Sequence, residues 1–264
     1  MRPKILPGFV PAMCVAAFAW NAHPRWLLVA IGNRDEFHER PAARLAAWEG
    51  DAGIIAGRDL RSGGTWLGVA TSGRFALVTN LRGYGDPDPT RASRGSLVTD
   101  LLAGSGRYAD PDTAPLDAFN PFNLILADGE SARFLTNRPE PVRTHLAHGI
   151  YGLSNGALDE PWPKTLALKA GLLDWLVSEA GEDLAPLFDT LRSERLEDIG
   201  LHPAQASDVP LEAPETPPFI RDPIYGTRCD TVVAIDREGR GMIVERRFSP
   251  SGAAAEETAL RFNW

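Results

Sequence analysis

Polar residues that suit acyl-transfer chemistry stand at the ends of several apolar runs in this sequence. Cys14 precedes the first of these runs and directly follows Met13. A thiol can attack an acyl carbon, amides can stabilise the oxyanion that forms, and neighbouring charges tune both groups. The other members of the set are Asn33-Arg34-Asp35-Glu36 after the second run, Asn80 and Asn155 after two later runs, and Arg228 before another.

The four residues from Asn33 to Glu36 follow an apolar stretch that we expect to be a buried strand. Three of the four can carry a charge, so this strand end needs ionic partners or solvent. Along a strand, Asn33 and Asp35 would share one face, and Arg34 and Glu36 would share the other. The spacing alone leaves open which carboxylate, Asp35 or Glu36, would face Cys14.

The later residues of the set also have simpler explanations. Asn80 and Asn155 are typical of turns, and Arg228 is typical of an ion pair with a carboxylate. Residues 152–156 match the pattern G-x-S-x-G, but a nucleophile elbow needs a helix directly after its serine. Two prolines delay the next helix here, so we attribute that match to chance. Only the combination of the remaining residues favours a functional site.

The chain before Cys14 bears on whether this cysteine can act. Three prolines interrupt the apolar residues there, which argues against a signal peptide. We expect residues 1–12 to be a flexible or spurious leader and residues 13–264 to form a single domain. Either translation begins at Met13, or processing exposes Cys14. The alternative is an ordinary disordered leader before an internal strand cysteine.

Composition and charge exclude several classes of protein. The 264 residues are 44% hydrophobic, which supports a real core. A net charge of −8 argues against a nucleic-acid binder, and no apolar run is long enough to span a membrane. Two cysteines cannot form a disulfide framework or a four-thiolate zinc site, although one Cys14–Cys229 bridge stays open on counting. We expect a reduced, cytoplasmic protein without a metal.

The elements that must position these residues are mostly short strands. Tight turns between apolar runs predict hairpins, so the sheets should be largely antiparallel. Regular alternation of strand and helix is lacking, which argues against a dinucleotide-binding fold. The expected strands are residues 14–20, 26–31, 54–57, 65–70, 74–79, 122–127, 132–136, 149–154, 229–235, 241–248 and 258–262.

Three helices are expected, at residues 90–103, 161–180 and 183–192. Thr90 can cap the first helix, and the proline-rich segment 201–223 should be an irregular loop. The second helix has the clearest helical spacing, which predicts a buried stripe. That stripe consists of Leu166, Ala170, Leu173, Val177 and Ala180.

Several motifs, taken in order, resemble the NRDE family of bacterial and eukaryotic proteins, which contains the transport-and-Golgi-organisation type. The resemblance covers nearly the whole chain from Met13, and its motifs are specific only together. They are Met13-Cys14, Gly32-Asn33-Arg34-Asp35-Glu36-Phe37, Gly63-Gly64-Thr65-Trp66-Leu67-Gly68, Thr79-Asn80-Leu81-Arg82, Ser93-Arg94-Gly95, Pro121-Phe122-Asn123-Leu124, Gly152-Leu153-Ser154-Asn155, Pro161-Trp162-Pro163-Lys164 and Tyr225-Gly226-Thr227-Arg228.

The family resembles cysteine-type N-terminal nucleophile hydrolases, which implies an α+β fold, a four-layer αββα sandwich of largely antiparallel sheets. The resemblance implies that loss of Met13 gives Cys14 a free α-amine that accepts the thiol proton. Related acylases hold an Arg-x-x-Asp-aromatic stretch after their second strand. Aligned on Phe37, that stretch falls on Asn33 and Glu36, with Arg34-Asp35 as the competing assignment.

The resemblance also implies roles for the other residues. It implies oxyanion donors at Asn80 and Asn155. Arg228 matches an arginine late in the chain of the related acylases, which could tune the thiolate. Motif or substrate-pocket positions are implied at Asn33, Arg34, Trp66 and Arg82. The expected reaction is cofactor-free hydrolysis of a small acyl-amide or thioester substrate. The rival implied by the resemblance is a non-catalytic binding or trafficking protein for haem or for lipid and acyl-CoA, on the same scaffold.

Overall fold

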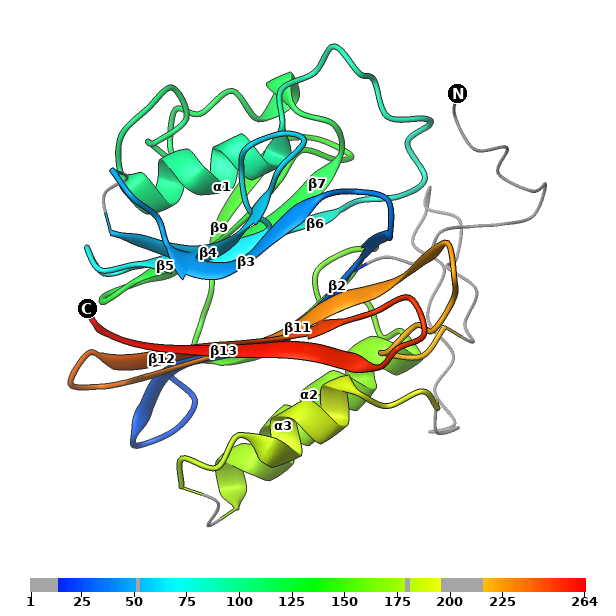
Figure 1. Ribbon diagram of the computed structural model, residues 1–264. Coiled ribbons are helices and arrows are strands. Elements are labelled where there is room, and N and C mark those ends of the chain that lie inside the picture. Colours follow the sequence, from blue (N-terminus) through cyan, green and yellow to red (C-terminus); the bar gives the residue numbers. More distant parts are fainter. Residues whose placement is uncertain (1–13, 51–52, 179–180, 196–215) are drawn as a thin grey trace.

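The computed structural model contains two stacked β-sheets with helices on both outer faces (Figure 1). It describes residues 14–50, 53–178, 181–195 and 216–264. From top to bottom in Figure 1 the layers are helix, sheet, sheet and helix. The fold is therefore the four-layer αββα sandwich that the family resemblance implied. The expected leader at residues 1–12 lies outside the described residues.

Sheet A is the six-stranded sheet that carries the N-terminal cysteine segment. Each neighbouring pair of its strands is antiparallel, as the hairpin pattern predicted. Its order is β10 (Gly149–Leu153), β1 (Val15–Trp20), β2 (Trp26–Phe37), β11 (Tyr225–Asp236), β12 (Arg240–Phe248) and β13 (Ala254–Asn263). The first strand of the chain thus lies inside the sheet, between β10 and β2.

Sheet B is the seven-stranded sheet opposite, and its pairs are also antiparallel. Its strand order follows the chain, and the long connection from β6 to β7 carries helix α1. The strands are β3 (Ala42–Ala47), β4 (Ile54–Asp59), β5 (Leu67–Ala70), β6 (Arg74–Asn80), β7 (Phe122–Asp128), β8 (Ala132–Thr136) and β9 (Val142–His145).

Helices cover the outer face of each sheet. Helix α1 (Arg94–Ala103) packs on sheet B, and it ends at Gly104, whose φ of 64° is the left-handed conformation that glycine tolerates. Helices α2 (Pro163–Val177) and α3 (Ala185–Leu191) pack on sheet A, and a short 3-10 turn lies at Leu116–Ala118. None of the described helices is long and apolar enough to cross a membrane.

Strand periodicity divides the apolar residues among three cores, one between each pair of layers. In β1, Ala16 and Phe18 point into the core between the two sheets, whereas Val15 and Ala17 point into the core under α2 and α3. All six residues of β1 are buried because both faces of the strand are covered.

The strands that carry the polar motif are longer than their apolar runs predicted. We expected a strand at residues 26–31, but β2 continues to Phe37 through the whole of Asn33–Glu36. Pairing with β11 satisfies the backbone there, so the strand does not need apolar side chains to continue. Strands β3 and β9 were missed altogether, and half or more of their residues are exposed. The first helix begins at Arg94, because Thr90 binds Asp88 in the preceding turn.

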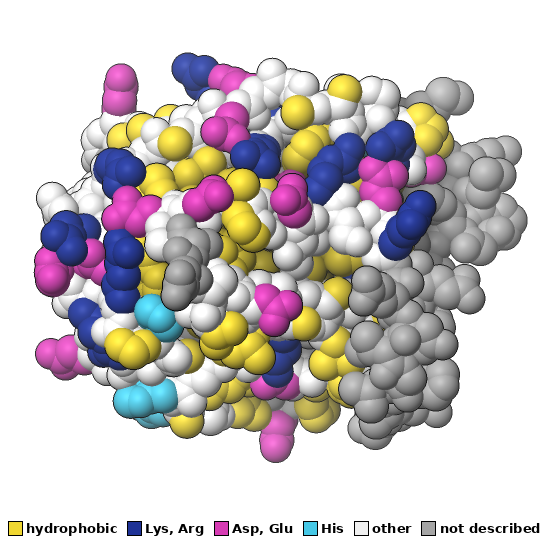
Figure 2. Space-filling view, turned by 90° about the horizontal axis from the view of Figure 1, so that it is seen from below, with side chains coloured by type: hydrophobic (Ala, Val, Ile, Leu, Met, Phe, Trp, Pro, Cys, Tyr) yellow, Lys and Arg dark blue, Asp and Glu magenta, His cyan; other side chains and the backbone are white. Residues whose placement is uncertain are grey.

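The predicted buried stripe of α2 was wrong. Leu173 and Val177 are 48% and 74% exposed, whereas the face on sheet A consists of Leu168, Leu172, Trp175 and Leu176. Helix α2 carries apolar residues on all of its faces, so periodicity alone could not select the face that packs on sheet A, which has the larger side chains. Figure 2 shows the surface on this side of the molecule, where apolar side chains are interrupted by charged ones.

Candidate active site

A cavity of about 540 Å³ lies where the end of β2 meets sheet B and the loop before α1. Both cysteines line it, together with Arg34, Asp35 and Glu36. The two sheets and the α1 segment each contribute to its wall, so residues far apart in the sequence meet there. Ligand-binding cavities of this size commonly accept small organic molecules.

Cys14 lies directly before β1, beside the end of the polar motif. The pairing of β1 with β2 ends at Val15 and Asn33, so Asp35 lies beyond the paired part of β2. The backbone of Asp35 contacts Cys14 there. The Cys14 Sγ donates to the Asp35 carbonyl oxygen at 3.9 Å. Burial and, after it, the negative charge of Asp35 raise the pKa of Cys14 to about 12, against the opposing charge of Arg34. The thiol is therefore neutral at pH 7 in this state.

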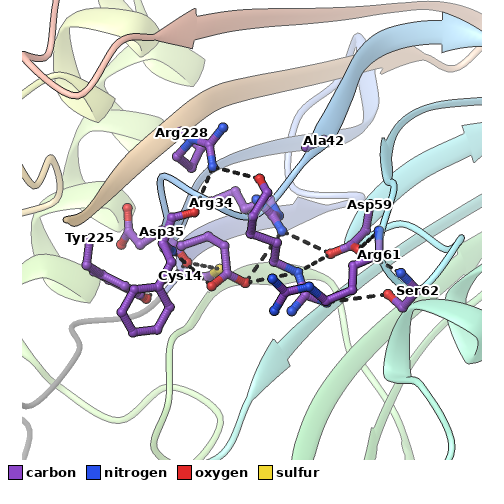
Figure 3. A network of polar contacts seen from close by, with 12 residues as sticks. Cys14, Arg34, Asp35, Ala42, Asp59, Arg61, Ser62, Tyr225 and Arg228 are labelled. Atoms are coloured by element: carbon purple, nitrogen blue, oxygen red, sulfur yellow. Dashed lines mark hydrogen bonds and ion pairs between the residues drawn. The ribbon is translucent and has the colours of Figure 1, made fainter. Parts of the chain in front are cut away.

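Arg34 and Glu36 point toward sheet B, on the face opposite Asn33, as strand periodicity predicted. Arg34 Nη2 lies 3.3 Å from Asp59 of β4 and 3.6 Å from Glu36. Arg40 joins both carboxylates, with its Nε at 3.5 Å from Glu36. Figure 3 shows this network between the end of β2 and the end of β4. Two arginines and two carboxylates therefore hold the cavity wall together.

Asp35 is buried and bound by the strand beside it. Its Oδ1 accepts a hydrogen bond of 2.6 Å from the Thr227 hydroxyl, and its carbonyl accepts one of 3.0 Å from the Tyr225 hydroxyl. Burial raises the pKa of Tyr225 well above its usual value, so the phenol is a donor at neutral pH. The start of β11 thus fixes Asp35 next to Cys14, as Figure 3 shows.

Asn33 lies outside the cavity and has a different role. Its amide nitrogen donates to the carbonyl oxygens of Leu191 and Pro218, both at 2.8 Å, which ties β2 to the end of α3. Asp230 lies directly across from it on β11, and burial raises the pKa of Asp230 well above its usual value. Asn33 Oδ1 and Asp230 Oδ1 both lack a hydrogen-bond partner among the described residues, and protonation would give the Asp230 carboxyl a donor that it otherwise lacks.

Trp66 lines the cavity and explains the glycine before the motif. A Cβ on Gly32 would lie 3.1 Å from the Trp66 ring and 3.0 Å from the Val15 carbonyl oxygen. The ring therefore packs against the β2 backbone, and any side chain at this position would push it away. This contact joins two of the motifs on which the family resemblance rests.

The two asparagines do not occupy equivalent positions. Asn80 ends β6 and lines the cavity. Asn155 is fully buried and does not line it, and its Nδ2 donates to the Asn80 carbonyl oxygen at 2.7 Å. The Thr79 hydroxyl also donates across this junction, to the Ser154 carbonyl oxygen at 2.6 Å. Asn155 thus positions Asn80, and the structure does not bring both amides to the open space.

Arg228 lines the cavity and braces the turn after β2. Its Nη1 donates to the carbonyl oxygens of Phe37 and Arg40 at 2.8 and 3.0 Å. Burial and the charges of Arg34 and Arg247 lower the pKa of Arg228. Arg82 does not line the cavity, and its backbone nitrogen donates to the Asn155 carbonyl oxygen.

Neither cysteine forms a disulfide. Cys229 pairs with Arg34 on one side of β2, while Cys14 lies beyond the other side, so one whole strand separates them. Burial raises the pKa of Cys229 well above its usual value. No group of three or more His, Cys, Asp or Glu side chains among the described residues could hold a metal ion.

Sequence reasoning missed much of the cavity wall. Arg40 and Asp59 complete the ion-pair network, and Arg94 and Glu245 also line the cavity. Arg94 stands in one of the family-like motifs, which could have pointed to it. Arg40 and Asp59 follow no motif and are brought in only by the pairing of β3 with β4.

Comparison with known proteins gives a consistent family match. A family model described as Transport and Golgi organisation 2 matches residues 13–250. A Transport and Golgi organization protein 2 homolog from Bos taurus is 33% identical, covering 93% of this chain and 97% of the relative. The homolog from Homo sapiens is 32% identical over the same shares.

Solved structures resemble the fold at low sequence identity. A mutant of conjugated bile acid hydrolase from Clostridium perfringens matches with a TM-score of 0.50 and 9% identity, over 95% of this chain and 97% of that one. This likeness concerns the fold, in which two antiparallel sheets lie between helical layers.

Proposed function

The chain belongs to the Transport and Golgi organisation 2 family, and from this premise we propose that it is an N-terminal nucleophile-type cysteine hydrolase. Its substrate is an amide or thioester, and its nucleophile is Cys14, exposed by loss of Met13. The observation that carries the proposal is Cys14, directly before β1, in the wall of a cavity that Arg34, Asp35 and Glu36 also line. The hydrolase-like fold supports it.

The protonation state of Cys14 explains why the preceding residues must be removed. A thiol with a pKa of about 12 offers almost no thiolate at neutral pH. A free α-amine on the same residue has an ordinary pKa of roughly 7.7, so it can accept the thiol proton near neutral pH. Its positive charge then also favours the thiolate. A reducing compartment such as the cytoplasm suits a free thiol nucleophile.

The reaction proceeds in two balanced steps. The α-amine accepts the thiol proton, the thiolate forms a bond to the acyl carbon, and the protonated amine returns the proton to the leaving amine or thiol as its bond breaks. Water then attacks the acyl–Cys14 thioester with the α-amine as base. This step releases the carboxylic acid and restores the thiol.

Two further residues have proposed roles in these steps. Asn80 lines the cavity at the end of β6 and supplies an amide donor for the oxyanion, held in place by Asn155. Asp35 orients the α-ammonium, because its charge acts on Cys14 more strongly than that of Glu36. Glu36 instead holds Arg34 and Arg40 in the wall.

The test compares a protein that begins at Cys14 with one that retains Met13, on chromogenic acyl amides and acyl thioesters. We expect turnover and an acyl adduct on Cys14 only in the first form, and neither in its Cys14→Ala variant. Cys229→Ala is the matched control for the second thiol in the cavity, and the adduct should stay on Cys14. Equal turnover by Cys14→Ala would refute the proposal.

Haem binding is the second candidate that the family resemblance raises. No histidine of the described residues lines the cavity, so a ligand to haem iron would have to be Cys14 or Cys229. Both thiols are held protonated by burial, which disfavours thiolate ligation. A Soret band on adding haem that disappears in Cys14→Ser would favour this function over hydrolysis.

A further inference from the structure

The cavity is positively charged although the whole chain is negative. Eight arginines and five acidic residues line it, whereas the chain carries 27 basic and 35 acidic residues. A concave surface of one sign attracts ligands of the opposite sign. The average charge of the chain would predict more acidic residues than arginines in the cavity. The excess of arginines therefore favours a negatively charged ligand.

The acidic residues do not neutralise the arginines evenly. Asp59 and Glu36 pair with Arg34 and Arg40, and Asp88 lies 3.7 Å from Arg91. No acidic side chain among the described residues lies within ion-pair distance of the other five arginines in the wall. These are Arg58, Arg61, Arg94, Arg228 and Arg247.

Arg94 is the one of these five that lies at the start of helix α1. It is the first residue of α1, and one of its N–H groups donates to the Pro121 carbonyl oxygen at 2.9 Å. Burial lowers its pKa to about 10, and the main charges that act on it include Cys14 and Glu36. The guanidinium is thus still charged at pH 7 and half-buried in the wall of the cavity that Cys14 also lines.

The first turn of α1 adds partial positive charge beside Arg94. Ser93, Arg94 and Gly95 line the cavity, and Ser93 makes no side-chain cap hydrogen bond. The first N–H groups of a helix carry a partial positive charge and lack partners within the helix. A Cβ on Gly64 would overlap the Gly95 carbonyl carbon, so the loop after β4 packs directly on the first turn of α1.

We propose that the cavity binds an anionic oxygen group of the substrate, a carboxylate or a phosphate, at Arg94 and the first turn of α1. This inference rests on the proposed function, since it names the substrate class of the same site. The acyl carbon lies at Cys14 on sheet A, and the anion lies on the sheet B side. Arg91, which is paired with Asp88, borders the same spot.

Two alkylating reagents of nearly equal shape test this without knowledge of the substrate. Iodoacetate is anionic and iodoacetamide is neutral, and both transfer their substituted methyl group to sulfur as iodide leaves. The full chain is treated with each at pH 9 in low salt, and labelling of Cys14 is followed by peptide mass mapping. The labelling rate with iodoacetate is divided by the rate with iodoacetamide. This ratio is then divided by the same ratio for a small peptide thiol under the same conditions.

We expect this normalised ratio to favour iodoacetate about tenfold and to fall toward one in high salt, such as roughly 0.5 M NaCl. Arg94→Gln should lower the ratio severalfold, and Arg94→Lys should restore part of it because the charge returns. Arg261→Gln removes the same charge from an exposed site and should leave the ratio unchanged. Inorganic phosphate and acetate are each added as competitors. The one that protects Cys14 from alkylation more strongly indicates whether the site prefers a phosphate or a carboxylate.

A ratio near or below one, or a preference that survives both high salt and Arg94→Gln, would overturn the inference. Hydrolysis of N-hexanoylglycine and N-hexanoylglycinamide separates this outcome from failure of the proposed function. Equal Cys14-dependent hydrolysis of both would support the function without the anion site. An iodoacetate preference that depends on Arg94, without hydrolysis of either, would support the anion site without the function.

Discussion

The Cys14 thiol is held protonated at neutral pH in the state that the structure describes, and its surroundings explain why. Burial and the charge of Asp35 favour the protonated thiol, whereas Arg34 opposes them. Its position directly before β1 places it in the cavity wall, and under the proposed function its reactivity depends on removal of the residues that precede it. The sequence identified this cysteine from Met13 and the family resemblance, but it could not reveal the protonation state, which depends on burial.

The first prediction concerns the pH dependence of Cys14 alkylation. With Met13 retained, about 3 in 100,000 thiols are ionised at pH 7.5 for a pKa of about 12, so the iodoacetamide rate should rise about tenfold per pH unit up to that pKa. In the form that begins at Cys14, the rate at about pH 7.5 should be at least roughly 100-fold higher. Peptide mass mapping of Cys14 measures both rates, and identical pH profiles would count against an activating α-amine.

The second prediction separates the two adjacent carboxylates. Asp35→Asn should reduce kcat about 100-fold or more, because the orienting charge next to Cys14 is lost while Thr227 can still bind the side chain. Glu36→Gln should chiefly raise KM, because it loosens the ion pairs with Arg34 and Arg40. Steady-state kinetics of the form that begins at Cys14 measure both. The reverse pattern would assign the orienting role to Glu36.

At the scale of elements, antiparallel pairing could be read from the sequence better than strand length. Hairpin turns predicted the antiparallel pairing, but the polar end of β2 was placed after the strand instead of inside it. β11 supplies its hydrogen bonds along that whole length, and no local pattern in β2 reports this. The same limit explains Arg40 and Asp59, which reach the site through pairing of β3 with β4.

The third prediction tests the face of α2 that packs on sheet A. Leu168→Ala should lower the free energy of unfolding by about 2–5 kcal/mol, since Leu168 is fully buried and its loss leaves a cavity. Leu173→Ala is the matched control on the face that periodicity had favoured, and it should change stability by less than about 0.5 kcal/mol. Urea unfolding measures both variants. Equal losses of unfolding free energy in the two variants would contradict the packing of the Leu168 face on sheet A.

The fourth prediction concerns Asp230, which lies across from Asn33. Burial raises its pKa in the folded protein, so the folded state holds the proton more tightly than the unfolded chain does. Its contribution to stability is full below the unfolded pKa near 3.8 and is lost as pH rises through the raised folded pKa. Asp230→Asn should therefore gain stability relative to the unmodified protein as pH increases above about 4. Urea unfolding from about pH 4 to 8 measures this, and a difference independent of pH would contradict it.

At the scale of the whole molecule, the site exists because two sheets face each other. Sheet A supplies Cys14 and the polar end of β2, and sheet B with α1 supplies Asn80 and Arg94. The resemblance predicted the layers and most of the sheet A residues. It did not predict the positive charge of the cavity, which arises only when arginines from both sheets and the α1 segment converge.

The central claim is that Cys14 becomes the N-terminal residue of the working protein. Intact mass spectrometry of the native protein, purified without a tag, tests it most directly. We predict a mass that corresponds to residues 14–264, with a free α-amine at Cys14. A mature protein that still carries Met13, or the residues before it, would contradict the account.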